Sequence, residues 1–212
     1  DFCLSRGLGD VYKRQDYLSI MQHDTSSYSK IRELQRRIAV YEDEAAYKEL
    51  FLMLFSSLTR FAASILRSRE LAEEVVSDVF IQIWNNRGSL EQIEDLRLYL
   101  FIATKNNAVA RYKQVHKQNT ISLDELEMET ASLYINPEER VMSAEMVRTI
   151  EQAIEQLPPR ARIIFKLAKE DRLRYKDIAS LLNISVKTVD HQLAISLRKI
   201  GKAIGTIIRK KS

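Results

Sequence analysis

The chain has 212 residues, of which 45% are apolar and 29% charged, so one large or two small domains with a packed core are expected. Only 5 glycines and 3 prolines occur, which argues against the many turns of a β-sandwich or barrel. The single cysteine excludes an internal disulfide and a cysteine-based zinc site and fits a cytoplasmic protein. No glycine-rich phosphate-binding motif occurs, and no wholly apolar run approaches the roughly 18 residues of a membrane span. No cofactor and no stable membrane insertion are therefore expected.

Charge is distributed unevenly along the chain. The net charge is +4, but residues 158–212 carry 14 basic and 4 acidic side chains, while residues 1–157 carry 19 basic and 25 acidic ones. A basic C-terminal quarter indicates a polyanionic partner for that part alone. A solvated basic tail would give the same count, so charge alone leaves both interpretations open.

The first half of the chain predicts a helical domain over residues 30–113. Residues 1–29 are expected to form a tail outside the fold, of which 1–15 share no periodicity with the rest and look like an artefact of the sequence. Apolar residues recur at helical spacing in four runs, at 30–41, 44–66, 69–84 and 95–112. Gly88 is expected to cap the third helix, and Tyr99 is expected in the core.

The second half predicts a linker over residues 114–136 and a second helical domain over 137–212. The linker is polar and acidic, and Asn136-Pro137 favours a helix start. Helices are expected at 138–156, 160–170, 175–182 and 186–200, with a break at Leu157-Pro158-Pro159. Gly201 and Gly205 are expected to weaken the last helix. The fold class is therefore all-α, with two small helical domains joined by a flexible linker.

Residues 175–200 have the pattern of a helix-turn-helix, in which the second helix enters the DNA major groove. Asn183 can adopt the left-handed conformation of the turn, and Ser185 can cap the second helix. The buried side of that helix is expected to carry Val186, Val189, Leu193, Leu197 and Ile200, and its exposed side Lys187, Thr188, His191, Gln192, Ser196, Arg198 and Lys199.

The exposed side of this second helix has the chemistry of DNA recognition. Gln192 can pair with an adenine edge, and Lys187 can reach guanine or phosphate. Arg198, Lys199 and Lys202 are better placed for phosphates, which position a protein without specifying sequence. Two helices that merely pack in a bundle are the structural alternative.

Four segments together resemble a bacterial RNA polymerase sigma factor of the extracytoplasmic-function (ECF) type of the sigma-70 family. AEEVVSDVFIQIW resembles the polymerase-docking helix of the family's domain two, and DLRLYLFIATKNNAVARYK resembles its promoter-melting helix. LPPRARIIFKL is similar to the helix before the DNA-reading motif of domain four, and RLRYKDIASLLNISVKTVDHQLAISLRK to that motif. The resemblance covers about residues 44–205.

The resemblance implies a transcription initiation factor that is not an enzyme. It would bind core RNA polymerase at its clamp and flap regions and direct it to promoter DNA; it also admits an anti-sigma factor as a partner. By resemblance, the linker would pass near the polymerase active centre and mimic nucleic acid with its acidic charge.

The resemblance also assigns roles to individual residues. The residues expected to contact the −35 element as duplex are Arg174, Lys187, Thr188, His191, Gln192, Ser196, Arg198 and Lys199. Those expected to contact the melted −10 element are Arg97, Lys105, Asn106, Asn107, Arg111, Tyr112 and Lys113, with the loop at 86–94 as the pocket for an extruded base. Those expected to dock on polymerase are Glu74, Asp78, Gln82, Trp84 and Asn85.

Several sequence features depart from the family's usual pattern or admit other functions. Arg174 stands where a Ser or Thr helix cap is common, and Ala110 occupies a site that is often acidic. One alternative is a helix-turn-helix regulator that acts without polymerase, normally as a dimer on a palindrome. A second is a metalloprotein that uses the acidic face of residues 70–78, although the isolated histidines offer no Glu-x-x-His partner.

Overall fold

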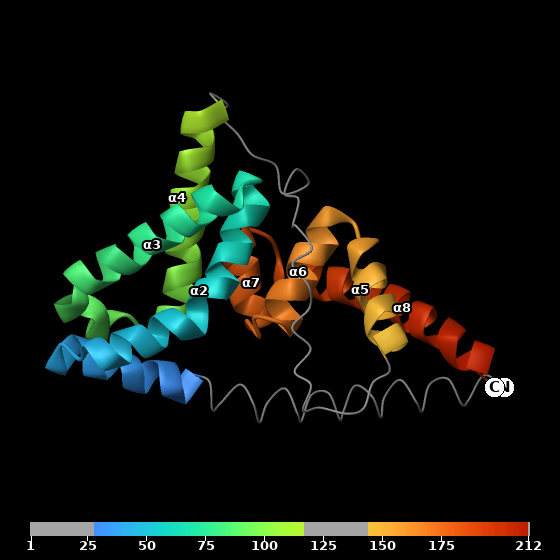
Figure 1. Cartoon of the computed structure of the whole chain (residues 1–212), viewed down its shortest axis with the longest axis horizontal. Helices are drawn as coiled ribbons and strands as arrows, with labels where there is room; N and C mark the ends of the chain where they lie inside the picture. Colours follow the sequence, from blue (N-terminus) through green and yellow to red (C-terminus); the bar gives the residue numbers. More distant parts are fainter. Residues whose placement is uncertain (1–27, 117–143, 212) are drawn as a thin grey trace. The chain divides into compact units, whose positions relative to one another are not determined.

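The computed structural model describes residues 28–116 and 144–211, and every regular element in these ranges is a helix (Figure 1). The predicted all-α class is therefore confirmed. The predicted linker at 114–136 and the helix start at Asn136 lie almost entirely outside the described residues. The chain divides into two compact units, and the described part of the first consists of residues 28–53 and 83–97.

The described part of the first unit starts with a helix over residues 28–41, which leads into α2 (Glu44–Leu66). The break falls at Glu42, whose φ of 51° is left-handed. Asp43 then caps α2, because its Oδ1 accepts a hydrogen bond from the Ala46 amide at 3.0 Å, and Arg37 pairs with Oδ2 at 2.7 Å. Figure 1 shows the 28–41 helix beside the start of α2, and Ile31, Leu34, Ile38 and Leu50 are buried in this unit.

The first unit also contains the end of α3 (Arg69–Asn85), the short 3-10 helix η1 (Arg87–Gln92) and the start of α4 (Leu96–His116). The expectation that Gly88 caps α3 is wrong. The helix ends at Asn85, and Gly88 lies inside η1. The φ of Gly88 is not positive, so it does not have the left-handed conformation of a C-cap glycine. The chain therefore leaves α3 by tightening into a 3-10 turn rather than by a left-handed glycine.

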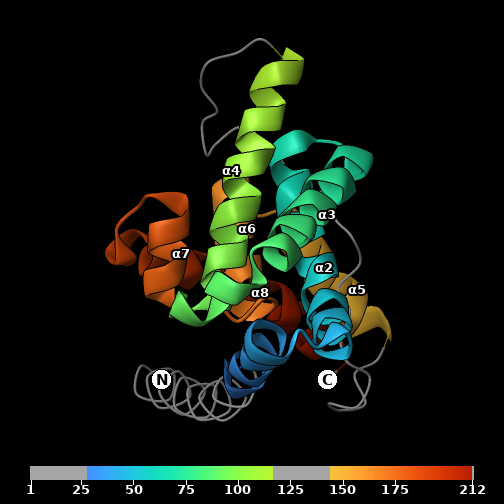
Figure 2. The same ribbon diagram turned by 90° about the vertical axis from the view of Figure 1, so that its left-hand side faces the viewer.

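The second unit contains the remainder of α2, α3 and α4 and all described residues from 144 onward. Within its first part, Phe61 of α2 and Phe101 of α4 are fully buried with ring centroids 5.6 Å apart. Figure 2 shows α4 as one continuous helix. Tyr99 of α4, by contrast, is 45% exposed, so the expectation that it belongs to the core is wrong.

One helix of the N-terminal half, α2, is long and apolar enough to cross a membrane by length and composition alone. A few polar residues interrupt α2, so the wholly apolar runs in its sequence are short. Of its most apolar window, 56% is buried inside the protein. A largely buried apolar helix is typical of a protein core, so this feature is weak evidence for a membrane span.

The C-terminal residues form four helices, α5 (Ala144–Glu155), α6 (Pro159–Lys169), α7 (Tyr175–Leu182) and α8 (Val186–Lys211). The predicted break at Leu157-Pro158-Pro159 is confirmed, with Pro159 at the first position of α6, where its missing amide hydrogen is not needed. Helix α8 packs on α5, α6 and α7. It continues through Gly201 and Gly205 to Lys211, so the two glycines do not end it.

Candidate nucleic-acid interface

The turn between α7 and α8 has the geometry that the sequence predicts. Asn183 has φ 53° and ψ 50°, which is the left-handed conformation. The Ile184 amide donates back to the Ala179 carbonyl at 2.9 Å, and the Ser185 hydroxyl accepts from the Thr188 amide at 3.0 Å. A left-handed residue that closes one helix and a serine that caps the next fix the angle at which α8 leaves the turn.

The start of α7 has an ion pair in place of a side-chain cap. Arg174 caps no amide, as its departure from Ser or Thr predicts. Its Nε instead lies 2.5 Å from Oδ2 of Asp177, whose side chain is almost fully buried. In the free protein two nitrogens of the Arg174 guanidinium, Nε and Nη2, are therefore paired with the Asp177 carboxylate.

The exposed face of α8 carries most of the side chains that the sequence assigns to it. Lys187, His191, Arg198 and Lys199 are exposed, and Thr188 and Gln192 are half-buried. These side chains lie on one side of the helix, in its first two turns and again about two turns later, so they form a cationic and hydrogen-bonding strip. A strip of this kind matches the phosphates and base edges of a DNA groove.

Three side chains of α8 lie on the opposite side from the one predicted. Ser196 is fully buried and donates its hydroxyl hydrogen to the Gln192 carbonyl at 2.8 Å, so the expectation of an exposed DNA-contacting Ser196 is wrong. The reason is its register, since it lies seven residues after the buried Val189 and therefore on the same face. Val186 and Leu197, expected to be buried, are 49% and 46% exposed.

The residues assigned to the −10 element all lie on α4, but they point in different directions. Arg97 and Tyr112 are only 7% and 8% exposed in the free protein, and their assignment to the −10 element stays a prediction. The Arg97 guanidinium lies 6.0 Å from the Tyr28 ring, a cation–π distance. Asn106 and Lys113 are exposed, and those that lie half-buried are Lys105, Asn107 and Arg111.

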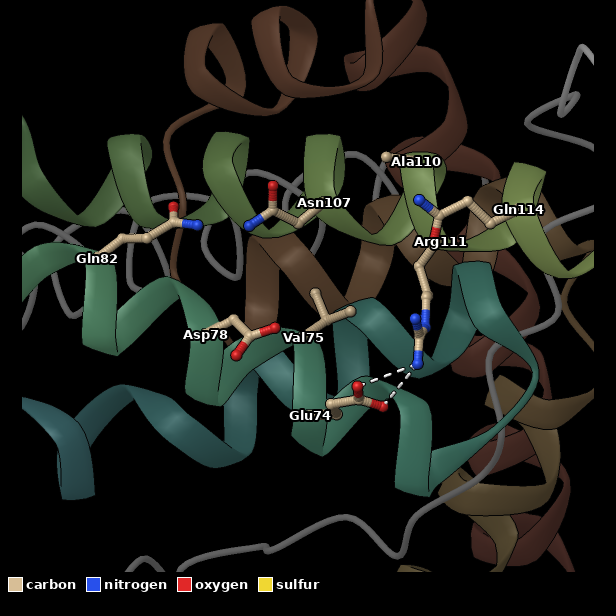
Figure 3. Close-up of a pocket in the computed structure, with 8 residues that line it drawn as sticks. All are labelled: Glu74, Val75, Asp78, Gln82, Asn107, Ala110, Arg111 and Gln114. Carbon is tan, nitrogen blue, oxygen red and sulfur yellow. Dashed lines mark hydrogen bonds and ion pairs between the residues drawn. The ribbon is translucent and has the colours of Figure 1, made fainter.

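A shallow polar groove of about 240 Å³ separates α3 from α4 (Figure 3). Its walls are Glu74, Asp78 and Gln82 from α3, at four-residue intervals, and Asn107, Arg111 and Gln114 from α4; Val75 and Ala110 also line it. The sequence analysis gave no binding role to Val75, Ala110 and Gln114, although spacings of three and four residues place such side chains on the same face of their helices as the predicted residues.

An ion pair crosses this groove. One guanidinium nitrogen of Arg111, Nη2, lies 3.0 Å from both carboxylate oxygens of Glu74 (Figure 3). The resemblance assigns Arg111 to DNA and Glu74 to polymerase, and the structure brings the two into direct contact. Each therefore screens the other's charge, and both side chains remain partly exposed.

The other docking candidates differ in accessibility. Asp78, Gln82 and Asn85 are exposed, and so is Ile81, which the sequence analysis missed. Trp84 is half-buried, with its ring 4.9 Å from the Tyr47 ring and 4.9 Å from the Arg87 guanidinium carbon. Burial also raises the pKa of the Tyr47 phenol. These contacts give Trp84 a packing role within the first unit.

A metal centre has no support among the residues that the structure describes. In residues 28–116 and 144–211, no three His, Cys, Asp or Glu side chains are grouped so that they could hold an ion. Two of the acidic side chains of α3 are paired with arginines, Glu73 with Arg69 and Glu74 with Arg111.

Comparison with known proteins identifies the family. Residues 50–117 match the family model described as sigma-70 region 2, and residues 148–200 match that of sigma-70 region 4. The first of these matches contains α3 and α4 with their groove, and the second contains the α7–α8 turn.

Similar proteins cover most of the chain. It is 24% identical to the ECF RNA polymerase sigma factor SigW of Bacillus subtilis, an alignment over 74% of this chain and 89% of that protein. It is 25% identical to the RNA polymerase sigma-H factor of Pseudomonas aeruginosa, over 79% of this chain and 91% of that protein. A solved structure of the sigma factor RpoE of Bartonella quintana with the anti-sigma factor NepR matches with a TM-score of 0.47 and 17% identity, over 75% of this chain and 96% of that one. The chain therefore belongs to the sigma-70 family, as a transcription initiation sigma factor of the ECF type.

Proposed function

We propose that this sigma factor binds core RNA polymerase, recognises the −35 promoter element as duplex with α8, and melts and holds the −10 element with α4 and the loop at 86–94. The observation that carries the proposal is the exposed strip of α8, which follows a well-formed helix-turn-helix turn in the part of the chain that matches sigma-70 region 4. A sigma factor of this kind regulates where transcription starts and is not itself a catalyst.

Recognition of the −35 element would combine base contacts and phosphate contacts. Lys187 lies in the first turn of α8, where the helix approaches the base edges most closely in helix-turn-helix proteins. Gln192 can form paired hydrogen bonds with adenine. Arg198 and Lys199, about three turns after Lys187, would hold the DNA backbone and make binding depend on salt concentration.

Capture of the −10 element would use the outer face of α4. Tyr99, Asn106 and Lys113 recur at intervals of seven residues, so they lie along one side of the helix, and all three are exposed. An exposed aromatic ring can stack on an unpaired base, while an amide and an ammonium group can bind the base edge and the phosphate. The loop at 86–94 would receive a base that leaves the stack.

Docking on polymerase would use the exposed side of α3. Asp78, Gln82 and Asn85 lie along it, and the exposed Ile81 adds an apolar contact between them. We extend the proposal to contacts of the C-terminal helices with the polymerase flap, to an anti-sigma factor as a second partner, and to a cytoplasmic location. The acidic linker, most of which lies outside the described residues, would pass near the active centre.

The test is transcription by purified core RNA polymerase with and without this protein on a library of genomic fragments. Sequencing of the transcript 5′ ends should show a new set of start sites that share one upstream motif. The variant Lys187→Ala should lose most of these starts, whereas the control Lys176→Ala, at an exposed lysine of α7, should keep them. Start sites unchanged by the protein would contradict the proposal.

A regulator that acts without polymerase is the competing function, and the same purified protein can be used to test it. Such a protein would protect a palindromic site on intact duplex in a footprinting experiment without core enzyme. For a sigma factor we expect protection only when core polymerase is present.

A further inference from the structure

The loop between α3 and α4 has a defined shape. Within η1, Leu90 is 1% exposed and anchors the loop in the core of the first unit. The Ser89 amide and hydroxyl both donate to the Asn86 carbonyl, at 3.0 and 2.8 Å, and the Ile93 amide donates to the Leu90 carbonyl at 3.0 Å. These local bonds close the turn but do not attach it to the rest of the protein.

One side chain from the 28–41 helix makes that attachment. Gln35 is 6% exposed, and its Nε2 donates to the Leu90 carbonyl at 2.5 Å and to the Ile93 carbonyl at 2.8 Å. An amide nitrogen has two hydrogens, so one hydrogen serves each carbonyl. The two acceptors lie 55 and 58 residues away in the sequence and belong to the end of η1 and the residue after it.

Arg87 attaches the other end of the loop. Its Nη1 donates to the Trp84 carbonyl at 3.1 Å, and its Nη2 lies 2.9 Å from a carboxylate oxygen of Glu42. Its guanidinium also lies over the Trp84 ring. The loop is therefore held at both ends, while Gly88, Ser89, Glu91, Gln92 and Glu94 between and after these attachments are exposed.

We propose that Gln35 is a positioning residue for promoter melting, which holds the 86–94 loop in the shape that receives the extruded −10 base before DNA arrives. This inference rests on the proposed function, because it assigns base capture to that loop. A loop ordered in advance loses less conformational entropy on binding, so more of the contact energy remains to offset unstacking of the base.

The buried position of Gln35 supports a role specific to this loop. A buried amide whose hydrogens had no hydrogen-bond acceptor would lower the stability of the fold, whereas an apolar side chain in the same space would not. Leu34 and Ile38, its neighbours on the same helix, are fully buried apolar residues that provide the packing. Gln35 instead donates both amide hydrogens to carbonyls of the loop. Replacing its side chain should therefore affect the loop more than the packing of the helix.

The first measurement uses the free full-length protein. Its single tryptophan, Trp84, contacts Arg87 and reports on the loop. In the variant Gln35→Met, which keeps the length of the side chain but has no hydrogen to donate, acrylamide should quench Trp84 fluorescence more strongly than in the wild type. The control Glu33→Gln, at an exposed position of the same helix, should leave quenching unchanged.

The second measurement uses the protein with core polymerase and promoter DNA that carries 2-aminopurine at each position of the −10 element in turn. Wild-type protein should give a fluorescence increase at the extruded base. Gln35→Met should reduce the apparent equilibrium constant for this extrusion about tenfold, a loss of about 1.4 kcal/mol. Binding of core polymerase and of a −35 duplex should be unchanged, which separates loss of positioning from loss of folding. Arg87→Ala, which frees the other end of the loop, should reduce extrusion in the same direction.

The outcomes separate the inference from the proposed function. If wild-type protein gives no signal at any −10 position, base capture itself fails and the role of Gln35 fails with it. If the wild type extrudes a base and Gln35→Met does so equally well, the positioning role alone is overturned. If Gln35→Met also loses core binding and −35 binding to the same degree, the residue has a general structural role and the inference is likewise overturned.

Discussion

The helix-turn-helix at 175–200 and the loop-bearing first unit place their binding groups by different physical means. In the helix-turn-helix, the exposed groups project from one regular helix, so their register follows from local periodicity and a single capped turn. In the first unit, the shape of the 86–94 loop depends on Gln35 and Glu42, both more than forty residues away in sequence.

This difference predicts different responses to substitution. A side chain on the exposed strip of α8 can be removed with loss of its own contact and little else. A side chain that holds the loop affects every group the loop presents. The following changes probe the helix-turn-helix, then the groove between α3 and α4, and then the first unit, from the largest expected effect to the smallest.

The largest effect should come from the core beneath the recognition strip. Leu193 is 2% exposed and lies on the buried side of α8. Leu193→Ala should lower the free energy of unfolding by about 2–5 kcal/mol, because it removes buried methyl groups and leaves a cavity. Chemical denaturation followed by circular dichroism measures this change. A loss below about 1 kcal/mol would show that the buried side of α8 contributes little to holding the strip in place.

Removal of one base-contacting group should have the next largest effect. Lys187→Ala should weaken binding of the polymerase complex to its preferred −35 sequence by about 1–3 kcal/mol and relax the preference at one position. Competition binding with single-base variants of the −35 element measures both.

The matched comparison is Arg198→Ala, which removes an expected phosphate contact from the same strip. It should weaken binding to all sequences alike and reduce the slope of log affinity against log salt by about 1. Equal effects of the two variants on sequence preference would contradict the division between base and phosphate contacts.

A smaller effect is expected in the groove between α3 and α4. Glu74→Gln should change stability by about 0–1 kcal/mol, because the Glu74–Arg111 pair is partly exposed. It should raise affinity for a single-stranded −10 oligonucleotide in the presence of core polymerase, since Arg111 is released, and Arg111→Ala should lower it. Fluorescence anisotropy of a labelled oligonucleotide measures the affinity of each variant. A fall in affinity for both variants would show that the pair, rather than free Arg111, is what DNA needs.

The smallest effect should be a pH dependence in the first unit. The Ala46 amide, followed by Arg37, lowers the pKa of the Asp43 carboxyl below its usual 3.8. The stability that this provides is fully present at pH values above 3.8 and is lost as the pH falls through the lowered folded-state pKa. Asp43→Asn keeps a helix cap but does not titrate, so the difference in melting temperature between it and the wild type should be constant near neutral pH and shrink in acid. A difference that stays constant down to strongly acidic pH would contradict this assignment.

Much of the molecule could be predicted from sequence because the signals are local. The helical periodicity predicted α2 and α7 with their observed ends, and Asn183 and Ser185 predicted the turn. The sigma-70 resemblance, which rests on motifs within one helix or two consecutive helices, agrees with the family matches. Side-chain direction at the margin of a helix face could not be predicted, as Val186 and Leu197 show, because exposure there depends on what packs beside the helix. Ser196, by contrast, lies in register with the buried Val189, so its burial follows from the helical period.

The sequence by itself determined the helical class, the family and the cationic strip of α8, since hydrophobic spacing and helix caps act over a few residues. Only the tertiary structure decided that Glu74 faces Arg111 across a groove, that Arg97 is buried, and that Gln35 holds a distant loop. Such contacts join residues that chain periodicity leaves unrelated, and they form only when packing of the helices brings the side chains within hydrogen-bonding distance.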